Sequence, residues 1–365
     1  MSTEQKMKSV QQLDPNMKLE EIDGKGLQWI SPMQSPIKIV GFPWLEEEKI
    51  YRRLPQNPRW PIRPDVDTLA NCTAGGQIRF ATNSCRLSIR VVLFAPFGMD
   101  HMTAAGQCGF DCYIGAPGQQ RHLSTTRFDY TQSEYESVLF DTDNTDFKNI
   151  TLNFPLYQGV KEVWLGVEPN AELSAPPEYE DVGKVIFYGT SITQGGCAAR
   201  PGMAFTNILS RRINREFINL GFSGNGRGEP ELAHIISEIP DVACYVLDYD
   251  ANVADAEAMQ NTLPEFIRIL REDHPLTPIS VISRVPTADE LYNSAGVENR
   301  LGKAKVQHDT VMQLQSQGDQ NISFLDGAEI MSDAYREGTV DGGHPTDLGF
   351  WLTANALEPV LKNLL

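Results

Sequence analysis

Four short segments in the second half of the chain hold the residue types from which a site for covalent catalysis can be built. They contain glycines, a serine, a histidine, aspartates and an asparagine, in the order GTSITQG (189–195), GFSGNG (221–226), DYDAN (248–252) and DGGHP (341–345). A serine hydroxyl becomes a useful nucleophile when a histidine takes its proton, and an aspartate orients that imidazole. Backbone N–H groups of glycine turns and an asparagine amide can stabilise an oxyanion. The inventory therefore indicates acyl-transfer chemistry.

The elements around these segments predict how they come together. After residue 184, short apolar runs alternate with helical patterns. Strands are expected at 185–188, 217–220, 242–247, 278–283 and 322–325, and helices around 205–213, 231–239, 263–270, 303–315 and 348–361. Continuously apolar strands separated by helices are typical of a parallel sheet covered on both faces. Because ligands bind beyond the carboxyl ends of such strands, we expect the four segments to converge at one edge of the sheet.

The first half of the chain has a different periodicity. Between residues 77 and 168, apolar and polar residues alternate in QIRFAT, RLSIRVV, NITLNF and EVWLGVE, and turn-rich stretches separate these runs. Period two is typical of antiparallel strands with one buried face, so the pattern predicts a β-sandwich without a convincing helix. The stretch PNAELSAPPEYE at 169–180 has three prolines, which exclude a central strand, and it is interpreted as a linker.

Length, composition and charge narrow the function classes. The chain has 365 residues, which predicts about two domains. With 31 basic and 48 acidic residues the net charge is −17, which argues against a nucleic-acid partner and against an anionic membrane surface. No apolar run reaches the length of a membrane helix, about 18 residues. The polar N-terminus does not resemble a secretory signal, so the sequence as it stands predicts a cytoplasmic protein; it would be periplasmic or secreted if a signal had been removed.

Cysteines and histidines do not form a recognisable ligand pattern. The six cysteines are too sparse for a disulfide scaffold, and Cys108 and Cys112 are interpreted as small core residues. The remaining histidines are scattered along the chain, so neither a metal nor another cofactor is predicted. Arg200 and Arg227 follow segments of the candidate site. Either could bind substrate oxygens, but their default interpretation is surface salt bridges.

The blocks GTSITQG, NLGFSGNG, DYDAN and DGGHP resemble, in the same order, those of the SGNH (GDSL-like) hydrolases. The resemblance implies that Ser191 is the nucleophile and that His344 and Asp341 complete a triad. It further implies an oxyanion hole formed by the N–H groups of Ser191 and Gly224 and the side chain of Asn252. Two departures are that Thr190 replaces the usual aspartate before the nucleophile, and that DAN replaces the usual Gly-Asn-Asp block.

An upstream segment extends the resemblance. GFDCY at 109–113 looks like the GxDLY-type motif of a β-domain that precedes a subset of these hydrolases, with Cys112 where leucine is usual. The implied fold is α/β: a jelly-roll-like β-sandwich at 1–175, with 1–25 as an irregular arm, followed by a flavodoxin-like three-layer α/β/α catalytic domain at 181–365. Asp111 is interpreted as a hydrogen-bonding residue that fixes the β-domain, with substrate contact as the alternative.

The function implied by this resemblance is a serine esterase that hydrolyses short acyl esters, most simply acetyl, on a small molecule or an oligosaccharide. Two alternatives stay open: a lysophospholipase or thioesterase on the same scaffold, and a non-catalytic carbohydrate-binding protein. The β-domain either determines the specificity for a sugar or merely forms one wall of the cleft. The sequence predicts neither the oligomeric state nor the natural alcohol.

Overall fold

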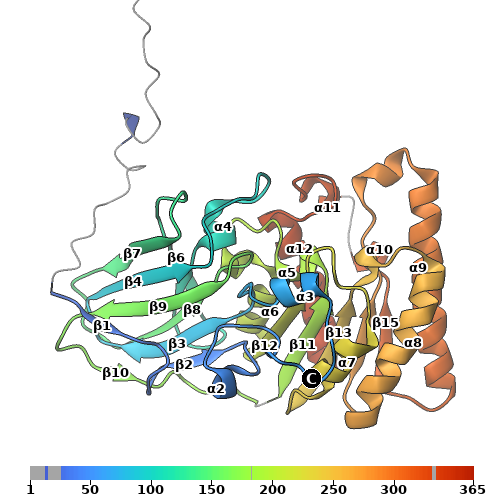
Figure 1. Cartoon of the computed structure of the whole chain (residues 1–365), viewed down its shortest axis with the longest axis horizontal. Helices are drawn as coiled ribbons and strands as arrows, with labels where there is room; N and C mark the ends of the chain where they lie inside the picture. The colour runs from blue at the N-terminus through green and yellow to red at the C-terminus, as the bar shows by residue number, and fades with distance from the viewer. Residues whose placement is uncertain (1–12, 15–25, 182, 331–333) are drawn as a thin grey trace, which may run out of the picture.

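The computed structural model describes residues 13–14, 26–181, 183–330 and 334–365. Figure 1 shows two parts side by side, a sandwich of strands on the left and a sheet flanked by helices on the right. This arrangement confirms the predicted fold class, an antiparallel β-sandwich followed by an α/β domain with a parallel sheet. Apart from residues 13–14, the irregular arm predicted for 1–25 lies outside the described residues.

Two antiparallel sheets form the N-terminal part. One has the strand order β1-β9-β4-β7, and the other has the order β10-β3-β8-β5-β6, with β2 also paired to β3. The strands are β1 (Gln28–Ile30), β2 (Lys38–Val40), β3 (Gln77–Thr82), β4 (Arg86–Leu93), β5 (Asp111–Ile114), β6 (Arg121–Thr125), β7 (Glu134–Asp141), β8 (Lys148–Asn153), β9 (Val160–Val167) and β10 (Leu173–Ser174).

Alternation along these strands produces the core of the sandwich. In β4, Ile89 and Val91 are buried while Arg90 between them is exposed, because successive side chains point to opposite faces. The buried faces of both sheets meet in one apolar cluster. Cys108 and Cys112 are fully buried members of that cluster, which confirms their interpretation as core residues.

Two details of the sandwich differ from the prediction. A five-residue helix, α4 (Ala104–Cys108), interrupts the region where no helix was expected; Thr103 caps it by accepting a hydrogen bond from the Gly106 N–H. One helical turn is too short to produce a visible periodicity. The predicted linker contains β10, a two-residue strand that is paired to β3 and lies between Pro169 and Pro176.

The C-terminal part is built on a parallel sheet with the strand order β12-β11-β13-β14-β15. Its strands are β11 (Lys184–Gly189), β12 (Phe217–Gly221), β13 (Val242–Asp248), β14 (Ile279–Ile282) and β15 (Ile322–Leu325). The register places Gly189 opposite both Gly221 and Asp248. The segments that follow these three strands therefore leave the sheet at the same level, as the sequence predicted.

Helices cover both faces of this sheet. Ile186 and Tyr188 of β11 pack in a cluster with residues of α7 and α8, whereas Val185 and Phe187 pack in another cluster with residues of α6 and α12. These alternating contacts make three layers. The α-helices of the chain are α2 (Leu45–Glu48), α3 (Pro64–Leu69), α4, α5 (Ser191–Gln194), α6 (Phe205–Ile213), α7 (Pro230–Ser237), α8 (Ala256–Asp273), α9 (Ser294–Ser316), α10 (Gly327–Ile330), α11 (Ala334–Glu337) and α12 (Asp347–Leu364), and the 3-10 helices are η2 (Pro201–Met203), η3 (Asp250–Asn252) and η4 (Ala288–Leu291).

Helix lengths show where capping matters more than periodicity. The helix expected at 263–270 starts at Ala256, because the Asp255 carboxylate accepts a hydrogen bond from the Ala258 N–H and caps it.

Among the helices that the structure describes, none combines the length and the apolar character needed to cross a bilayer.

The N-terminal part also contributes directly to the core of the α/β part. Val66 of α3 is buried in the cluster that covers one face of the parallel sheet. The fully buried Arg53 donates hydrogen bonds from Nη1 to the carbonyl oxygens of Gly221 (2.5 Å) and Asn219 (3.2 Å). Arg53 thereby braces the end of β12, where one of the candidate site segments begins.

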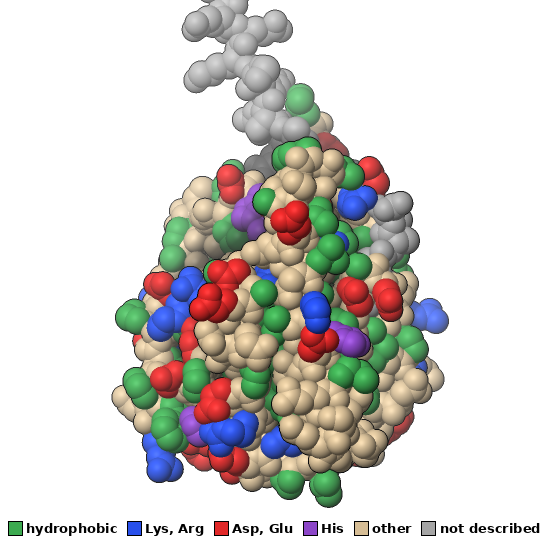
Figure 2. Space-filling view, turned by 90° about the vertical axis from the view of Figure 1, so that its right-hand side faces the viewer, with side chains coloured by type: hydrophobic (Ala, Val, Ile, Leu, Met, Phe, Trp, Pro, Cys, Tyr) green, Lys and Arg blue, Asp and Glu red, His purple; other side chains and the backbone are tan. Residues whose placement is uncertain are grey.

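The high net charge is not gathered into one patch on the face turned to the viewer in Figure 2. Acidic and basic side chains lie interspersed over that face. Helices α8 and α9 carry exposed ion pairs of this kind, such as Arg268 with Glu265 and Lys305 with Asp309. Exposed pairs contribute little to stability because water screens their charges, so they mainly balance the local charge.

Candidate active site

Ser191 stands at the first position of α5, immediately after β11. Thr190 caps this helix through its side chain and forms a capping box with Thr193, which fixes the turn from strand to helix. The turn is tight at Gly189, where a Cβ would lie 2.0 Å from Thr193 Oγ1 and 2.6 Å from the Asp248 carbonyl oxygen. Glycine is therefore required there, and the tight turn holds the Ser191 side chain at the edge of the sheet.

The side chains of Ser191, His344 and Asp341 form a continuous hydrogen-bonded chain. Ser191 Oγ lies 2.9 Å from His344 Nε2, and His344 Nδ1 lies 2.7 Å from Asp341 Oδ2. Because the carboxylate can only accept, Nδ1 carries the ring proton and Nε2 is left to accept the Ser191 proton. The structure thus brings together the three residues that the resemblance nominated, although 153 positions separate the serine from the histidine.

The loop before α12 fixes the aspartate locally. Asp341 Oδ1 accepts hydrogen bonds from the backbone N–H groups of His344 (2.7 Å) and Gly343 (3.0 Å). Partial burial on its own would raise the pKa of Asp341, but the hydrogen bonds from the His344 ring and from these two N–H groups, together with the charge of His344, lower it to about 2. Asp341 is therefore ionised at any pH at which an imidazole can act as a base.

Asn252 lies on the wall of a cavity that Ser191 and His344 also line. Its Oδ1 accepts a hydrogen bond from the Gly226 N–H at 3.2 Å, which leaves both Nδ2 hydrogens available as donors. The structure therefore places this amide in the same cavity as the serine.

Gly224 lies in the turn that follows β12. It has a φ of +68°, a backbone conformation that favours glycine, and its carbonyl oxygen accepts hydrogen bonds from the Arg227 side chain. The turn adjoins the end of β11 because the Phe222 N–H donates to the Gly189 carbonyl at 3.0 Å. The sequence favoured a surface salt bridge for Arg227, but its side chain instead stabilises this turn through the hydrogen bonds to Gly224.

The cavity beside Ser191 has a volume of about 260 Å³. Its lining is largely apolar and includes Ile192, Ile282, Val285 and Leu357. Its volume is close to the lower end, about 300 Å³, of the range that is typical of ligand pockets, so a small organic group fits there.

Asp248 is a further acidic residue of this cavity that sequence reasoning did not single out. Burial raises the pKa of Asp248 to about 7; a hydrogen bond from Thr193 Oγ1 (2.8 Å) opposes the rise and the charge of Asp250 adds to it. Its position at the end of an apolar strand indicated that Asp248 lies at the edge of the sheet. The sequence does not reveal how deeply its carboxyl group is enclosed.

Asp111 of the GFDCY motif joins the two parts of the molecule. Its fully buried carboxylate accepts hydrogen bonds from Arg200 Nη1, the Gly202 N–H and Asn153 Nδ2, each at 2.8 Å. The first two partners lie in the segment after α5, and the third is in β8. Asp111 therefore has a structural role, as favoured from sequence, but it fixes the interface as well as the β-domain. Arg200 is not a surface salt bridge, because its partner is completely buried.

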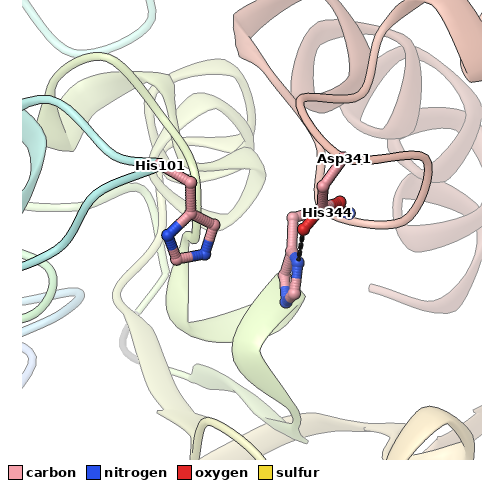
Figure 3. A group of neighbouring side chains, drawn as sticks. All are labelled: His101, Asp341 and His344. Atoms are coloured by element: carbon pink, nitrogen blue, oxygen red, sulfur yellow. Dashed lines mark hydrogen bonds and ion pairs between the residues drawn. The ribbon is translucent and has the colours of Figure 1, made fainter.

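His101 is a residue of the β-domain that reaches the site and that sequence reasoning missed. Its ring centroid lies 5.7 Å from that of His344, with an angle of 76° between the ring planes. Figure 3 shows the two rings as neighbours, with one nitrogen of His101 turned towards His344. One ligand atom each of His101, His344 and Asp341 lies within 4.8 Å of the other two. No sequence spacing could reveal this group, since His101 is more than 200 positions from both Asp341 and His344.

Comparisons with known proteins agree with this architecture. A model of the GDSL-like lipase/acylhydrolase family matches residues 183–362, and a model of the GxDLY N-terminus of SGNH-hydrolase-type esterases matches residues 27–173. No curated protein matches the chain.

Several solved structures are similar over nearly the whole chain. A protein described as a GDSL-like lipase from Bacteroides ovatus is 29% identical, with a TM-score of 0.85 and coverage of 93% of this chain and 98% of the other. The salicylyl-acyltransferase SsfX3 of a tetracycline biosynthetic pathway is 20% identical, with a TM-score of 0.74 and the same coverage. A family two carbohydrate esterase from Cellvibrio japonicus is 14% identical, with a TM-score of 0.58 and again the same coverage. The last two similarities concern the fold. On the strength of the two family models and the first of these structures, the chain belongs to the GDSL-like lipase/acylhydrolase family of carboxylic ester hydrolases and carries the GxDLY-type N-terminal domain of SGNH esterases.

Proposed function

We propose that this protein hydrolyses carboxylic esters with Ser191 as nucleophile, His344 as general base and Asp341 as the group that orients and stabilises the imidazole. The observation that carries the proposal is the hydrogen-bonded chain from Ser191 Oγ to His344 Nε2 (2.9 Å) and from His344 Nδ1 to Asp341 Oδ2 (2.7 Å), which opens on a cavity. We further propose that the chain divides into a β-domain at 1–175 and a catalytic domain at 181–365.

In the proposed mechanism, Ser191 Oγ attacks the ester carbonyl while His344 Nε2 takes its proton. The tetrahedral intermediate collapses, His344 returns the proton to the departing alcohol, and the acyl group stays on Ser191. Water then attacks the acyl-enzyme with the same base, which releases the carboxylic acid and restores the serine. Every proton transfer passes through His344 Nε2, so the reaction needs no co-reactant other than water.

The oxyanion of each tetrahedral intermediate needs donors that are already in place. We assign this role to the N–H groups of Ser191 and Gly224 and to Nδ2 of Asn252. The hydrogen bond from Gly226 to Asn252 Oδ1 supports the assignment, because it orients the amide with its donors free. Preorganised donors cost no reorganisation during the reaction, which is why each contributes strongly to the rate.

For the substrate we propose a short acyl ester, most simply acetyl, on a carbohydrate. Support comes from the similar fold of proteins described as family two carbohydrate esterases, one of them in complex with cellohexaose, and as an acetyl xylan esterase. The β-domain supplies His101 to the site, so it would form one side of the subsite for the alcohol.

The cavity favours a second candidate, a thioesterase or lysophospholipase that acts on a longer acyl group. Its volume of about 260 Å³ and its apolar wall of Ile192, Ile282, Val285 and Leu357 suit a chain of several carbons. Burial of each additional CH₂ contributes about 0.8 kcal/mol, so a chain that fits would be strongly preferred over acetyl.

One experiment separates these candidates. The kcat/KM values for p-nitrophenyl acetate, butyrate and octanoate are compared, and acetate release from acetylated xylo- and cello-oligosaccharides is measured. Highest kcat/KM on acetate, with release from the oligosaccharides, supports the carbohydrate esterase; a rise of tenfold or more towards octanoate supports the second candidate. A protein that cleaves none of them and resists labelling by a fluorophosphonate contradicts both and favours a carbohydrate-binding role.

A further inference from the structure

The loop between β4 and α4 is held across the domain interface in a way that presents His101 to the site. Thr103 Oγ1 donates a hydrogen bond of 2.6 Å to the carbonyl oxygen of Ala199, which lies in the segment after α5. At the other end of the loop, the buried Gln107 side chain accepts hydrogen bonds from the N–H groups of Gly98 (3.0 Å) and Met99 (3.2 Å). His101 lies between these anchors, so its approach to His344 is a consequence of the fold.

His101 and His344 have matching environments. Nδ1 of each ring lies beside a carboxylate: Asp100 Oδ1 at 3.2 Å from His101, and Asp341 Oδ2 at 2.7 Å from His344. For His101, a carboxylate on one ring nitrogen leaves the other nitrogen with its lone pair, and histidines that bind zinc commonly have such a partner. Asp100 is fully exposed, so its contact orients the ring only weakly.

We propose that His101, His344 and Asp341 bind one divalent transition-metal ion of the zinc type at the domain interface, and that the bound ion blocks the proposed triad. Imidazole nitrogens and a carboxylate oxygen are ligands that Zn²⁺ accepts readily, whereas Mg²⁺ prefers an all-oxygen site. The inhibition rests on the proposed function, because the ion would take up the imidazole that must accept the Ser191 proton. The binding does not rest on it.

The spacing is compatible with such an ion after a small movement. Ligands of a tetrahedral zinc ion lie about 3.4 Å apart, since each bond is about 2.1 Å long. The ligand atoms of the three residues lie within 4.8 Å of one another, and 36% of the His101 side chain is exposed. A rotation of this accessible ring closes the gap. The 2.7 Å hydrogen bond between His344 Nδ1 and Asp341 Oδ2 must also open to about 3.4 Å, and the single proton of the neutral ring moves from Nδ1 to Nε2 as Nδ1 binds the ion.

Binding is tested first, in a form that does not depend on catalysis. The full-length Ser191→Ala protein is freed of metal with EDTA, dialysed and titrated with ZnCl₂ in a calorimeter. We expect one zinc ion per chain and an affinity at least about tenfold lower when His101→Phe is added, because the ring remains but its ligand nitrogens are lost. His122→Ala, which removes an exposed histidine of the β-domain, should leave the affinity unchanged. Equal affinity with and without His101→Phe, or no zinc binding, would overturn the proposal.

Inhibition is tested next on the otherwise unmodified chain. Zinc should reduce hydrolysis of p-nitrophenyl acetate, EDTA should restore the rate, and MgCl₂ should have no effect. With His101→Phe, the zinc concentration for half inhibition should rise by about tenfold or more relative to that variant's own metal-free rate. Zinc that binds through His101 but leaves the wild-type rate unchanged would contradict the inhibition and the role of His344 as base. Failure of the proposed function is thereby distinguished from failure of the metal site.

Discussion

The two histidines that meet at the site reach it by different means. His344 is positioned mainly by its own loop, because Asp341 binds both its ring and its backbone N–H only three positions away. His101 is positioned by contacts that span the domain interface, of which the hydrogen bond from Thr103 to Ala199 joins residues 96 positions apart. The first arrangement is local and visible in the sequence, whereas the second exists only once the two domains have packed.

This contrast separates the chemistry of the site from its assembly. Ser191 and the proposed oxyanion residues come from strand ends of the α/β domain, which the parallel register aligns, and Asp341 and His344 come from the loop before α12. The β-domain contributes the groups that fix the segment after α5, above all Asp111. Changes in the first set should therefore act mainly on the rate, and changes in the second set should act mainly on stability.

The largest effect is expected for Ser191→Ala. Loss of the nucleophile should lower kcat by a factor on the order of 10⁶ with an unchanged melting temperature, as for a serine hydrolase whose triad acts as a unit. Ser223→Ala is the matched control, because Ser223 is the other serine of the four candidate segments. Its backbone N–H donates a hydrogen bond to the Gln194 side chain. Steady-state rates on p-nitrophenyl acetate check both variants, and substantial activity of Ser191→Ala would refute the nucleophile assignment.

Asp341→Asn should follow, with a loss of about 10⁴ in kcat. An amide at this position no longer favours the tautomer with the proton on His344 Nδ1, so Nε2 would present a hydrogen to Ser191 instead of a lone pair. KM should change little, because Asp341 lies behind the histidine and away from the substrate. A kcat within tenfold of wild type would mean that another group orients His344.

The sequence was sufficient for those features that depend on short-range order. Apolar strands followed by glycine turns predicted the parallel sheet, and the order of its segments predicted which side chains converge. Gly189, at the end of β11, illustrates why this works: its close contacts with Thr193 and with Asp248 require glycine and so leave a trace in the sequence.

Features that depend on packing between distant segments could not be predicted. His101 lies on a loop without periodicity. Its proximity to His344 follows from the hydrogen bond of Thr103 across the interface and from the hydrogen bond of Gln107 within the loop. Arg200 was misinterpreted for the same reason, because a sequence does not show that the partner of an arginine is fully buried. The enclosure of Asp248 likewise depends on the cavity walls around it.

The interface is tested by Asp111→Asn, which should destabilise the protein by about 3 kcal/mol. Removal of one partner from a buried ion pair typically costs about 3–5 kcal/mol, and the lower end applies because 21% of the Arg200 side chain stays exposed. Chemical denaturation followed by tryptophan fluorescence measures the change.

The control for this variant is Glu136→Gln, which removes an ion pair with Arg90 on the surface of the sandwich. It should cost less than about 1 kcal/mol. Equal stability of the two variants would show that the contact between Asp111 and Arg200 contributes no more than a surface pair, and the distinction drawn between the two sets of residues would fail.

Asn252→Ala should lower kcat by about 10²–10³, the usual effect of removing one oxyanion donor. The loss should appear in kcat more than in KM, because the donor interacts with the charge that develops in the transition state. Asn299→Ala, which removes an amide on α9 that binds the Ala254 carbonyl, is the control. An unchanged rate for Asn252→Ala would exclude it from the oxyanion hole.

The smallest effect concerns two aspartates of the site whose pKa values depart from 3.8 in opposite directions. The pKa of Asp341 is lowered to about 2, mainly by hydrogen bonds that outweigh its desolvation, so Asp341 stabilises the fold above pH 4 and this contribution is lost as the pH falls from about 4 to 2. Burial raises the pKa of Asp248 to about 7, so the folded state binds a proton there more tightly than the unfolded state does. Asp248 therefore makes the protein less stable as the pH rises from about 4 to 7.

Melting temperatures of Asp341→Asn and Asp248→Asn, each compared with wild type between pH 3 and 8, separate the two contributions. The deficit of Asp341→Asn should be present at neutral pH and shrink below pH 4, because protonation then removes the same interaction from the wild type. Asp248→Asn should gain stability relative to wild type as the pH rises towards 8, because its amide avoids the cost of enclosing a carboxylate. A difference for Asp248→Asn that does not vary with pH would show that this carboxyl group is more hydrated than its place in the cavity wall implies, and the cavity would then suit polar rather than apolar acyl groups.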